Sequence, residues 1–159
     1  MTISEPDLRS PLDQLHPDYD ERPFFEQTLT LLRSVRDHDF DTLAELCDDD
    51  FGIVDVDPSG ASVAVRTRAD WEHWFDQLFA QLDALHAATD SEILDYVAVE
   101  GPTFGYSVLD FRQTLTMEGL TAAFDCLATI IWKSTPDGWR EARWHASVLS
   151  TDIPTGFGA

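Results

Sequence analysis

Basic residues are scarce in this chain of 159 residues: 30 acidic residues stand against ten basic ones, and Lys133 is the single lysine. The formal net charge is −20. Nucleic-acid binding depends on lysine and arginine side chains that neutralise phosphates. Attraction to an anionic membrane surface depends on the same charges. We therefore expect neither nucleic acid nor membrane as a partner.

Long apolar runs are also missing, and none approaches the ~20 residues of a membrane helix. Residues 1–23 contain acids and four prolines but no apolar core. This stretch predicts a flexible N-terminal arm rather than a signal peptide. The two cysteines, Cys47 and Cys126, fall in a helix pattern and a strand pattern. Buried free thiols are the expectation, and they favour a cytoplasmic location.

Motifs for metals, phosphates and activated nucleophiles are absent from the sequence. The five histidines form no H-x-H or H-E-x-x-H spacing, and the cysteines are far apart. The Asp48–Asp50 run lacks the alternating ligands and glycine of an EF-hand loop. There is no glycine-rich phosphate loop and no G-x-S-x-G elbow. We expect no metal and no cofactor.

The acidic excess has two interpretations. It fits a salt-adapted cytoplasm, where acidic surfaces stay soluble and salt screens their mutual repulsion. It also fits a proteome that is simply rich in acids. Charge of this kind informs on solubility and not on fold.

Three helical patterns occupy the first half of the chain. The first covers residues 24–37, and the second covers 40–47 with Asp39 as its N-cap. The third begins at Thr67, where Asp70 completes a capping-box-like start. Its apolar face follows helical spacing. That face consists of Trp71, Trp74, Phe75, Leu78, Phe79, Leu82 and Leu85.

Strand patterns fill the rest of the chain. Two short ones, at 51–56 and 61–66, flank a turn at 58–60, and a third lies at 92–100. Three long ones follow at 103–117, 120–135 and 139–151, with turns at Glu118-Gly119 and at 136–138. We expect a single α+β domain over residues 24–151, in which a cone-shaped, bent mixed sheet encloses three N-terminal helices. Residues 152–159 are expected to be a loose tail.

Alternation along the long strands separates two sheet faces. Asp110, Arg112, Asp125 and Thr129 share one face if Glu118-Gly119 is a tight turn. The other face is apolar. It carries Leu109, Phe111, Phe124, Cys126, Ile130 and Trp132. If the helices cover the polar face, a monomer exposes the apolar row, so we expect a homodimer through the sheet.

The chain resembles the nuclear transport factor 2-like superfamily, in its SnoaL-like and ketosteroid-isomerase-like branch. The resemblance covers residues 24–150. It is carried by residues 39–46 running into 49–51, by residues 71–75, and by the C-terminal stretches 129–133, 137–140 and 145–147. The C-terminal stretches also look like the end of the calcium/calmodulin kinase association domain. The resemblance implies the cone, but one cone serves isomerases, dehydratases, cyclases, hydrolases and assembly modules.

The resemblance implies a carboxylate base on the first strand after the second helix, which is Asp55, or Asp57 if the alignment slips by two residues. The oxyanion donors of ketosteroid isomerases fall near Leu31 and Thr129, where neither residue type is kept. This departure argues against a ketosteroid isomerase. The expectation is a cofactor-free acid–base enzyme acting on a small, mainly apolar molecule. The alternative is a non-catalytic ligand-binding or assembly domain.

Each candidate site residue has a structural alternative. Asp55 is a candidate general base or an aspartate at a strand end. His145 is a candidate proton shuttle beside Ser147 or a histidine hydrogen-bonded within the sheet. Arg112, beside Asp110 and Asp125, is a candidate anchor for an oxyanion or carboxylate or part of a solvated polar face. Trp74 fits a lid over the pocket or simply core. We expect Asp55, Arg112 and His145 to converge on one cavity. The candidates expected around the ligand are Asp110, Asp125, Thr129, Ser147 and Trp74.

Overall fold

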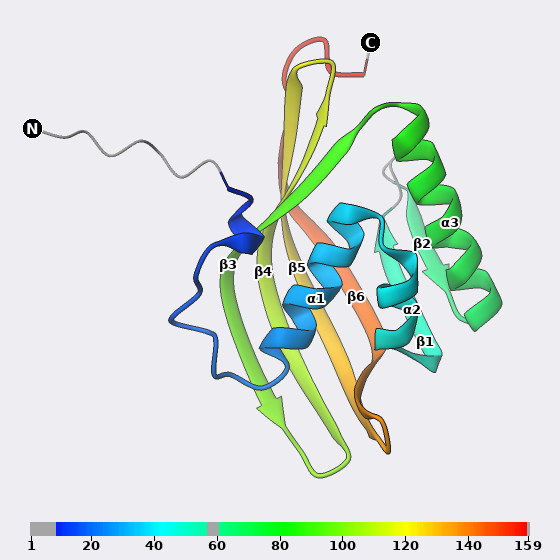
Figure 1. The fold of residues 1–159 in the computed structure, drawn as a ribbon. Helices are drawn as coiled ribbons and strands as arrows, with labels where there is room; N and C mark the ends of the chain where they lie inside the picture. Colours follow the sequence, from blue (N-terminus) through cyan, green and yellow to red (C-terminus); the bar gives the residue numbers. More distant parts are fainter. Residues whose placement is uncertain (1–8, 57–60, 159) are drawn as a thin grey trace, which may run out of the picture.

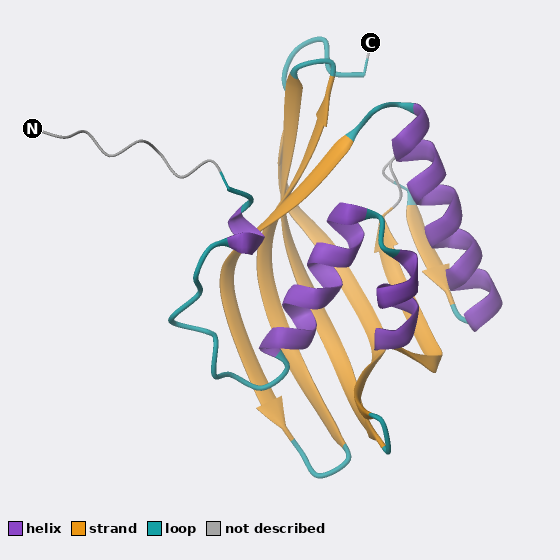
Figure 2. Cartoon of the chain, viewed as in Figure 1, coloured by secondary structure: helices purple, strands orange, loops and turns teal. Residues whose placement is uncertain are grey.

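A strongly bent sheet wraps around the helices in the computed structural model, which describes residues 9–56 and 61–158 (Figures 1 and 2). The helices are a short 3-10 helix η1 (Pro11–Asp13), α1 (Phe25–Asp37), α2 (Phe40–Leu46) and α3 (Arg68–Ala84). The strands are β1 (Cys47–Val56), β2 (Ser62–Val65), β3 (Ala88–Glu100), β4 (Phe104–Met117), β5 (Leu120–Thr135) and β6 (Gly138–Asp152). This arrangement confirms the predicted α+β cone.

Both predicted N-caps are present. The Asp39 carboxylate accepts a hydrogen bond from the Thr42 backbone N–H at 3.2 Å. The Thr67 hydroxyl oxygen accepts one from the Asp70 backbone N–H, also at 3.2 Å. Each bond satisfies one of the amide groups that a helix leaves unpaired at its start. The predicted apolar face of α3 turns into the core, except that Leu85, just beyond the helix, is exposed.

The sheet has the strand order β2-β1-β6-β5-β4-β3. All neighbouring strands are antiparallel except β1 and β6, which run parallel. The β4–β5 hairpin turns at Glu118 and Gly119, whose φ angles are 51° and 78°. Two positive φ angles match the twist of a two-residue hairpin turn, so the predicted tight turn is confirmed. The predicted turn at 58–60 lies outside the described residues.

The two faces of the sheet separate as the alternation predicts, but the helices cover the apolar one. Leu109 pairs with Ala128 and Ser107 with Ile130, and all four are fully buried under the helices. Asp110, Arg112, Asp125 and Thr129 share the opposite, convex face. The expectation that a monomer exposes the apolar row is therefore wrong. Leu109, Phe111 and Cys126 pack in the main core cluster with side chains of α1 and α3. Ile130 and Trp132 pack in a second cluster with Phe24.

The N-terminal segment lies against the domain from residue 9 onward. Leu12 is completely buried, and Tyr19 packs its ring against Phe25 and Tyr96. The flexible arm predicted for residues 1–23 thus has a packed part, residues 9–23. None of the helices in the described part of the chain has the length and apolarity that a membrane crossing requires.

Candidate functional site

Asp55 lies near the end of β1 with its side chain on the concave face of the sheet. Its strand neighbour Ile53, on the same face, is buried and pairs with Trp144 of β6. The Trp144 indole Nε1 donates a hydrogen bond to Asp55 Oδ2 at 3.0 Å. This contact spans the parallel pairing of two strands that are distant in the chain. The Trp144 indole on β6 thus fixes the orientation of the Asp55 carboxylate on β1.

Apolar side chains and a thiol surround this carboxylate. The rings of Trp144 and Phe111 meet edge-on at 5.9 Å. Cys126 of β5 lies close enough to Asp55 to sense its charge. Burial raises the pKa of the Cys126 thiol to about 11, and the Asp55 charge adds to the shift. A carboxylate, an indole N–H and a protonated thiol therefore meet on the concave face.

Trp74 is placed on the same side of the sheet as Asp55. It is half-buried on α3, packs against the core cluster, and contacts the ring of Phe75 at 4.9 Å. The structure thus keeps two of the predicted site residues, Asp55 and Trp74, inside the cone. Both the core role and the lid role of Trp74 are compatible with this position.

Arg112 and Asp125 form an ion pair on the convex face. The Arg112 Nε donates to Asp125 Oδ1 at 2.8 Å, and Ser150 Oγ donates to Asp125 Oδ2 at 3.4 Å. The Arg112 hydrogen bond holds the pKa of Asp125 below its usual value, and the same bond raises the pKa of Arg112. Both side chains are well exposed. This pair matches the solvated polar face that was the alternative for Arg112.

His145 also lies on the convex face, paired with Thr129 of β5 and Val54 of β1. His145, Thr129 and Ser147 are exposed, and Asp110 is half-buried on the same face. The sheet itself separates these residues from Asp55. Asp55, Arg112 and His145 therefore do not converge on one cavity, contrary to the expectation from the sequence.

Two neighbours of Asp55, Trp144 and Cys126, were not among the predicted site residues. Their signal in the sequence is alternation, because each is next to a residue that faces outward, His145 and Asp125. Using that signal requires knowing that β1 pairs in parallel with β6 and that bulges interrupt the β5–β6 register. Neither fact can be obtained from local periodicity.

The positions expected for oxyanion donors supply none. Leu31 is buried in the core cluster, and Thr129 points away from the helices. Within residues 9–56 and 61–158, no group of three or more histidine, cysteine, aspartate or glutamate side chains is arranged to hold a metal ion. What the arrangement offers chemically is one oriented carboxylate beside aromatic walls.

Comparison with solved structures identifies the same cone in other proteins. A hexachlorocyclohexane dehydrochlorinase (LinA type 2) is 10% identical, with a TM-score of 0.65 over 80% of this chain and 83% of that one. A candidate scytalone dehydratase from Novosphingobium aromaticivorans is 8% identical, with a TM-score of 0.69 over 81% and 83%. A candidate dehydratase of the NTF2-like family from Streptomyces avermitilis is 17% identical, with a TM-score of 0.66 over 85% and 99%. At these identities the likeness shows the fold.

No curated protein matches the chain. The model of the SnoaL-like domain, however, matches residues 28–151, which spans most of the sequence and includes Asp55, Cys126 and Trp144. The chain therefore belongs to the SnoaL-like domain family.

Proposed function

We propose that the protein binds a small, mainly apolar molecule inside the cone and that Asp55 acts on it as a general base. The reaction class is cofactor-free isomerisation, dehydration or cyclisation. One observation carries the proposal: the Asp55 carboxylate is oriented by Trp144 on the concave face, beside aromatic side chains. A carboxylate in such surroundings is suited to removing a proton from carbon.

Trp144 and Cys126 have supporting roles in this scheme. The Trp144 N–H holds one carboxylate oxygen and so fixes the orientation of the Asp55 carboxylate on the concave face. The Cys126 thiol, with a pKa of about 11, stays protonated at neutral pH. It donates its hydrogen bond to the Phe124 carbonyl at 3.5 Å, so it lines the site as a neutral group rather than attacking as a nucleophile. Two of the similar structures bear names that denote eliminations, a dehydratase and a dehydrochlorinase, and eliminations of this kind also begin with a base.

The test is deuterium exchange at carbon. Wild-type protein is incubated in deuterium oxide with a panel of small cyclic ketones, and nuclear magnetic resonance follows loss of the proton next to the carbonyl. We expect catalysed exchange with at least one member of the panel. Asp55→Asn should lower the rate by about 10²–10⁴-fold, the usual contribution of a general base. Its melting temperature should stay the same or rise, because a charge among apolar side chains costs stability.

Asp110→Asn is the matched control, since it removes the same charge from the opposite face of the sheet. It should leave the exchange rate unchanged. If ketones bind to wild type and to Asp55→Asn alike but no exchange occurs, the ligand-binding alternative holds instead. If Asp110→Asn lowers exchange as much as Asp55→Asn, the base is not Asp55.

A second proposal, assembly into a homodimer through the sheet, has its own observation. An apolar strip crosses the convex face, where water would otherwise meet it. Its exposed members are Val54, Val97, Val99, Phe104 and Tyr106, between 42% and 54% exposed. Val108 and Ile131 lie between them in the cross-strand register. An apolar strip on a chain this rich in acids fits a self-complementary two-fold interface.

Sedimentation tests the dimer directly. We expect wild type to sediment as a dimer at micromolar concentration and Tyr106→Glu to sediment as a monomer with its helical content retained. Glu100→Gln, at the end of the same strand as Val97, changes the charge outside the strip and should remain dimeric. A wild-type monomer under these conditions would remove the assembly proposal and leave the proposal for Asp55 untouched.

A further inference from the structure

Residues 9–23 bridge the gap between α1 and the edge strand β3 (Figures 1 and 2). The centre of the bridge is Leu12 in η1, which has no exposed surface and belongs to the core cluster. The Arg33 guanidinium of α1 donates to the Leu12 carbonyl at 2.7 Å. A leucine buried by a three-residue helix acts as a plug between two larger elements.

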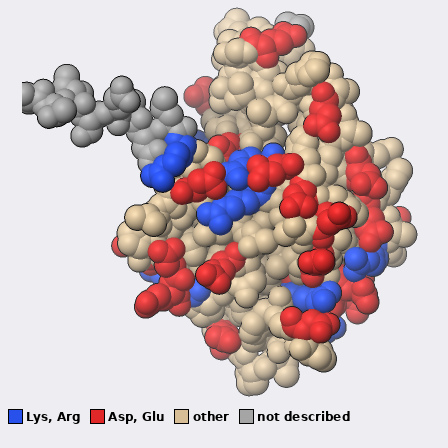
Figure 3. Space-filling view, viewed as in Figure 1, with Lys and Arg blue, Asp and Glu red and all other residues tan. Residues whose placement is uncertain are grey.

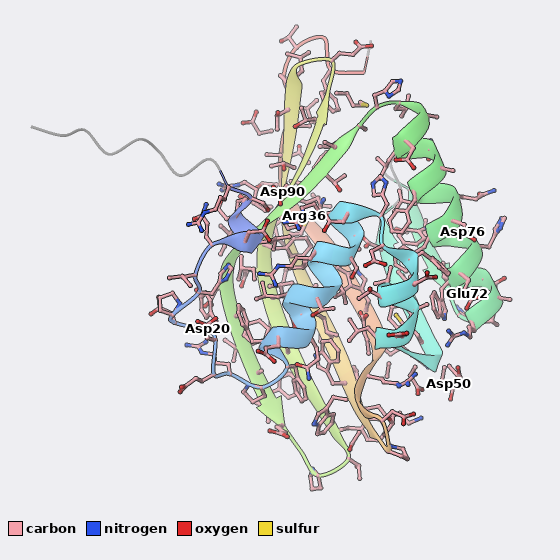
Figure 4. The ribbon with its side chains drawn as sticks, in the orientation of Figure 1. Asp20, Arg36, Asp50, Glu72, Asp76 and Asp90 are labelled. Carbon is pink, nitrogen blue, oxygen red and sulfur yellow. The ribbon has the colours of Figure 1, made fainter. Side chains whose placement is uncertain are left out.

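Polar side chains form hydrogen bonds around Leu12 to both the sheet and α1. Ser10 Oγ donates to Asp90 Oδ1 of β3 at 2.7 Å and accepts from Arg36 Nη1 of α1 at 2.9 Å. Arg36 Nη1 also donates to Asp13 Oδ2 at 2.9 Å. Figure 4 shows Arg36 and Asp90 beside each other next to η1. These hydrogen bonds of Ser10, Asp13 and Arg36, here called the clasp, join the helix layer to the sheet edge through the N-terminal segment.

Further along, the same segment covers the open edge of β3 with side chains. The Tyr19 hydroxyl donates to the Leu94 carbonyl at 3.4 Å, and Arg22 donates to the Tyr96 carbonyl. Among the described residues, the segment's backbone-to-backbone hydrogen bonds stay within it or reach Phe25. A segment held by side chains, without a strand ladder, opens at a smaller free-energy cost than the strands beneath it.

A hollow of about 300 Å³ lies between this segment and β3. Four of its lining residues come from the segment and two from β3. They are Pro11, Gln14, Leu15, His16, Glu92 and Ile93. Ile93 pairs with Phe111, which pairs with Cys126, so one row of side chains runs across the concave face from the hollow to the site beside Asp55.

We propose that residues 9–23 are a strap that closes a side entrance to the cone, with Leu12 as its plug and Ser10, Asp13 and Arg36 as its clasp. Withdrawal of Leu12 opens a path along Ile93 and Phe111 to Cys126 and Asp55. The proposal rests on the proposed small-molecule site. It concerns access to that site, which can be measured without any activity.

The two cysteines provide the measurement. Cys126 lies at the inner end of the path, and Cys47 is fully buried at the start of β1, where it pairs with Glu141 of β6. The folded protein is treated with iodoacetamide, and mass spectrometry follows alkylation of each cysteine separately. Cys47 then reports global unfolding, and Cys126 reports opening of the entrance. We expect Leu12→Ala and Arg36→Gln each to raise the Cys126 rate about tenfold relative to the Cys47 rate, because both loosen the strap.

Asp18→Ala is the matched control. Asp18 lies on the same segment, is exposed and does not line the hollow, so both alkylation rates should stay at wild-type values. The proposal is overturned if Cys126 and Cys47 accelerate together in both strap variants, since the fold as a whole has then loosened. It is equally overturned if proteolysis shows residues 14–22 released while Cys126 keeps its wild-type rate. The two proposals are tested separately, because the alkylation rates report access to the site and the exchange rate of Asp55→Asn reports the role of Asp55 as the base.

Discussion

Glu141 is a buried carboxyl group that forms no ion pair within the described part of the chain. It is 1% exposed, and its Oε2 accepts a weak hydrogen bond from Cys47 Sγ at 3.8 Å. Its Oε1 has no hydrogen-bond partner among the described residues. Burial raises the pKa of Glu141 well above its usual value. The neutral acid is thus the form that the folded protein favours.

This burial predicts that Glu141→Gln stabilises the protein more as the pH rises. The folded pKa lies above the unfolded one, so the wild type is favoured below the unfolded pKa of about 4.3 and loses stability as pH rises toward the folded pKa. The loss is about 1.4 kcal/mol for each pH unit in that window. Urea unfolding at several pH values should show the variant gaining on wild type as the pH rises above the unfolded pKa. Glu45→Gln on the exposed face of α2 should show no such pH-dependent gain.

Asp55 illustrates what could be predicted at the residue scale. Its place at the end of a strand after the second helix follows from the sequence pattern and the resemblance. Arg112 and His145 were expected beside it because the resemblance places all three residues on strands that line the cone. Alternation does not say which face the helices cover. Which face is covered depends on how the helices pack on Leu109 and Phe111, and this packing is a property of the assembled layers.

At the scale of elements, the β4–β5 hairpin contains a residue under strain. Glu118 has φ 51°, a left-handed conformation that costs a residue with a Cβ about 1 kcal/mol. Asparagine tolerates this conformation better, and Asn-Gly is a preferred pair for such a turn. We predict that Glu118→Asn stabilises the protein by about 0.5–1 kcal/mol in urea unfolding.

Glu118→Gln is the control for this turn. It removes the charge but keeps a side chain of the same shape, which is equally strained at this positive φ angle. It should change stability by less than half as much as Glu118→Asn. An equal gain from both variants would assign the effect to charge removal on an acidic surface, and the strain would then be negligible.

Element boundaries were predicted best where the pattern was long. The bounds 120–135 of β5 match the structure, and α3 begins one residue after its capping threonine. The start of β1 was missed, since Asp48, Asp49 and Asp50 suggested a break. Within the strand, two of those acids have ion-pair partners. Lys133 Nζ lies 3.2 Å from Asp48 Oδ2, and Arg68 Nη1 lies 2.8 Å from Asp49 Oδ1. Such partners come from distant segments and leave no local trace.

For the whole molecule, charge is the dominant solution property. Acidic side chains spread over the face shown in Figure 3 and do not gather in one patch, and basic side chains lie next to acidic ones. With a net charge of −20, the surface repels itself at low ionic strength. The Debye length falls from about 30 Å at 0.01 M salt to about 3 Å at 1 M, so salt relieves the repulsion.

We therefore predict that the melting temperature rises between about 0.05 M and about 2 M potassium chloride. Differential scanning calorimetry measures it, and sucrose at equal osmolality serves as the control for solvent exclusion. A melting temperature that stays constant or falls would contradict the prediction. It would also count against the salt-adapted interpretation and leave the acid-rich proteome as the simpler one.

The parallel pairing of β1 with β6 joins segments that lie roughly ninety residues apart in the chain. During synthesis at about 5–20 residues per second, β1 waits roughly five to twenty seconds for this neighbour. Until then Phe51 and Ile53 of β1, and Trp71 and Phe75 of α3, have no sheet to cover them. The antiparallel hairpins of β3, β4 and β5 form in chain order and also wait for β6 before the sheet is complete. The nascent chain is thus at greater risk of aggregation than the folded protein. The risk falls once β6 is synthesised and pairs with β1 and β5.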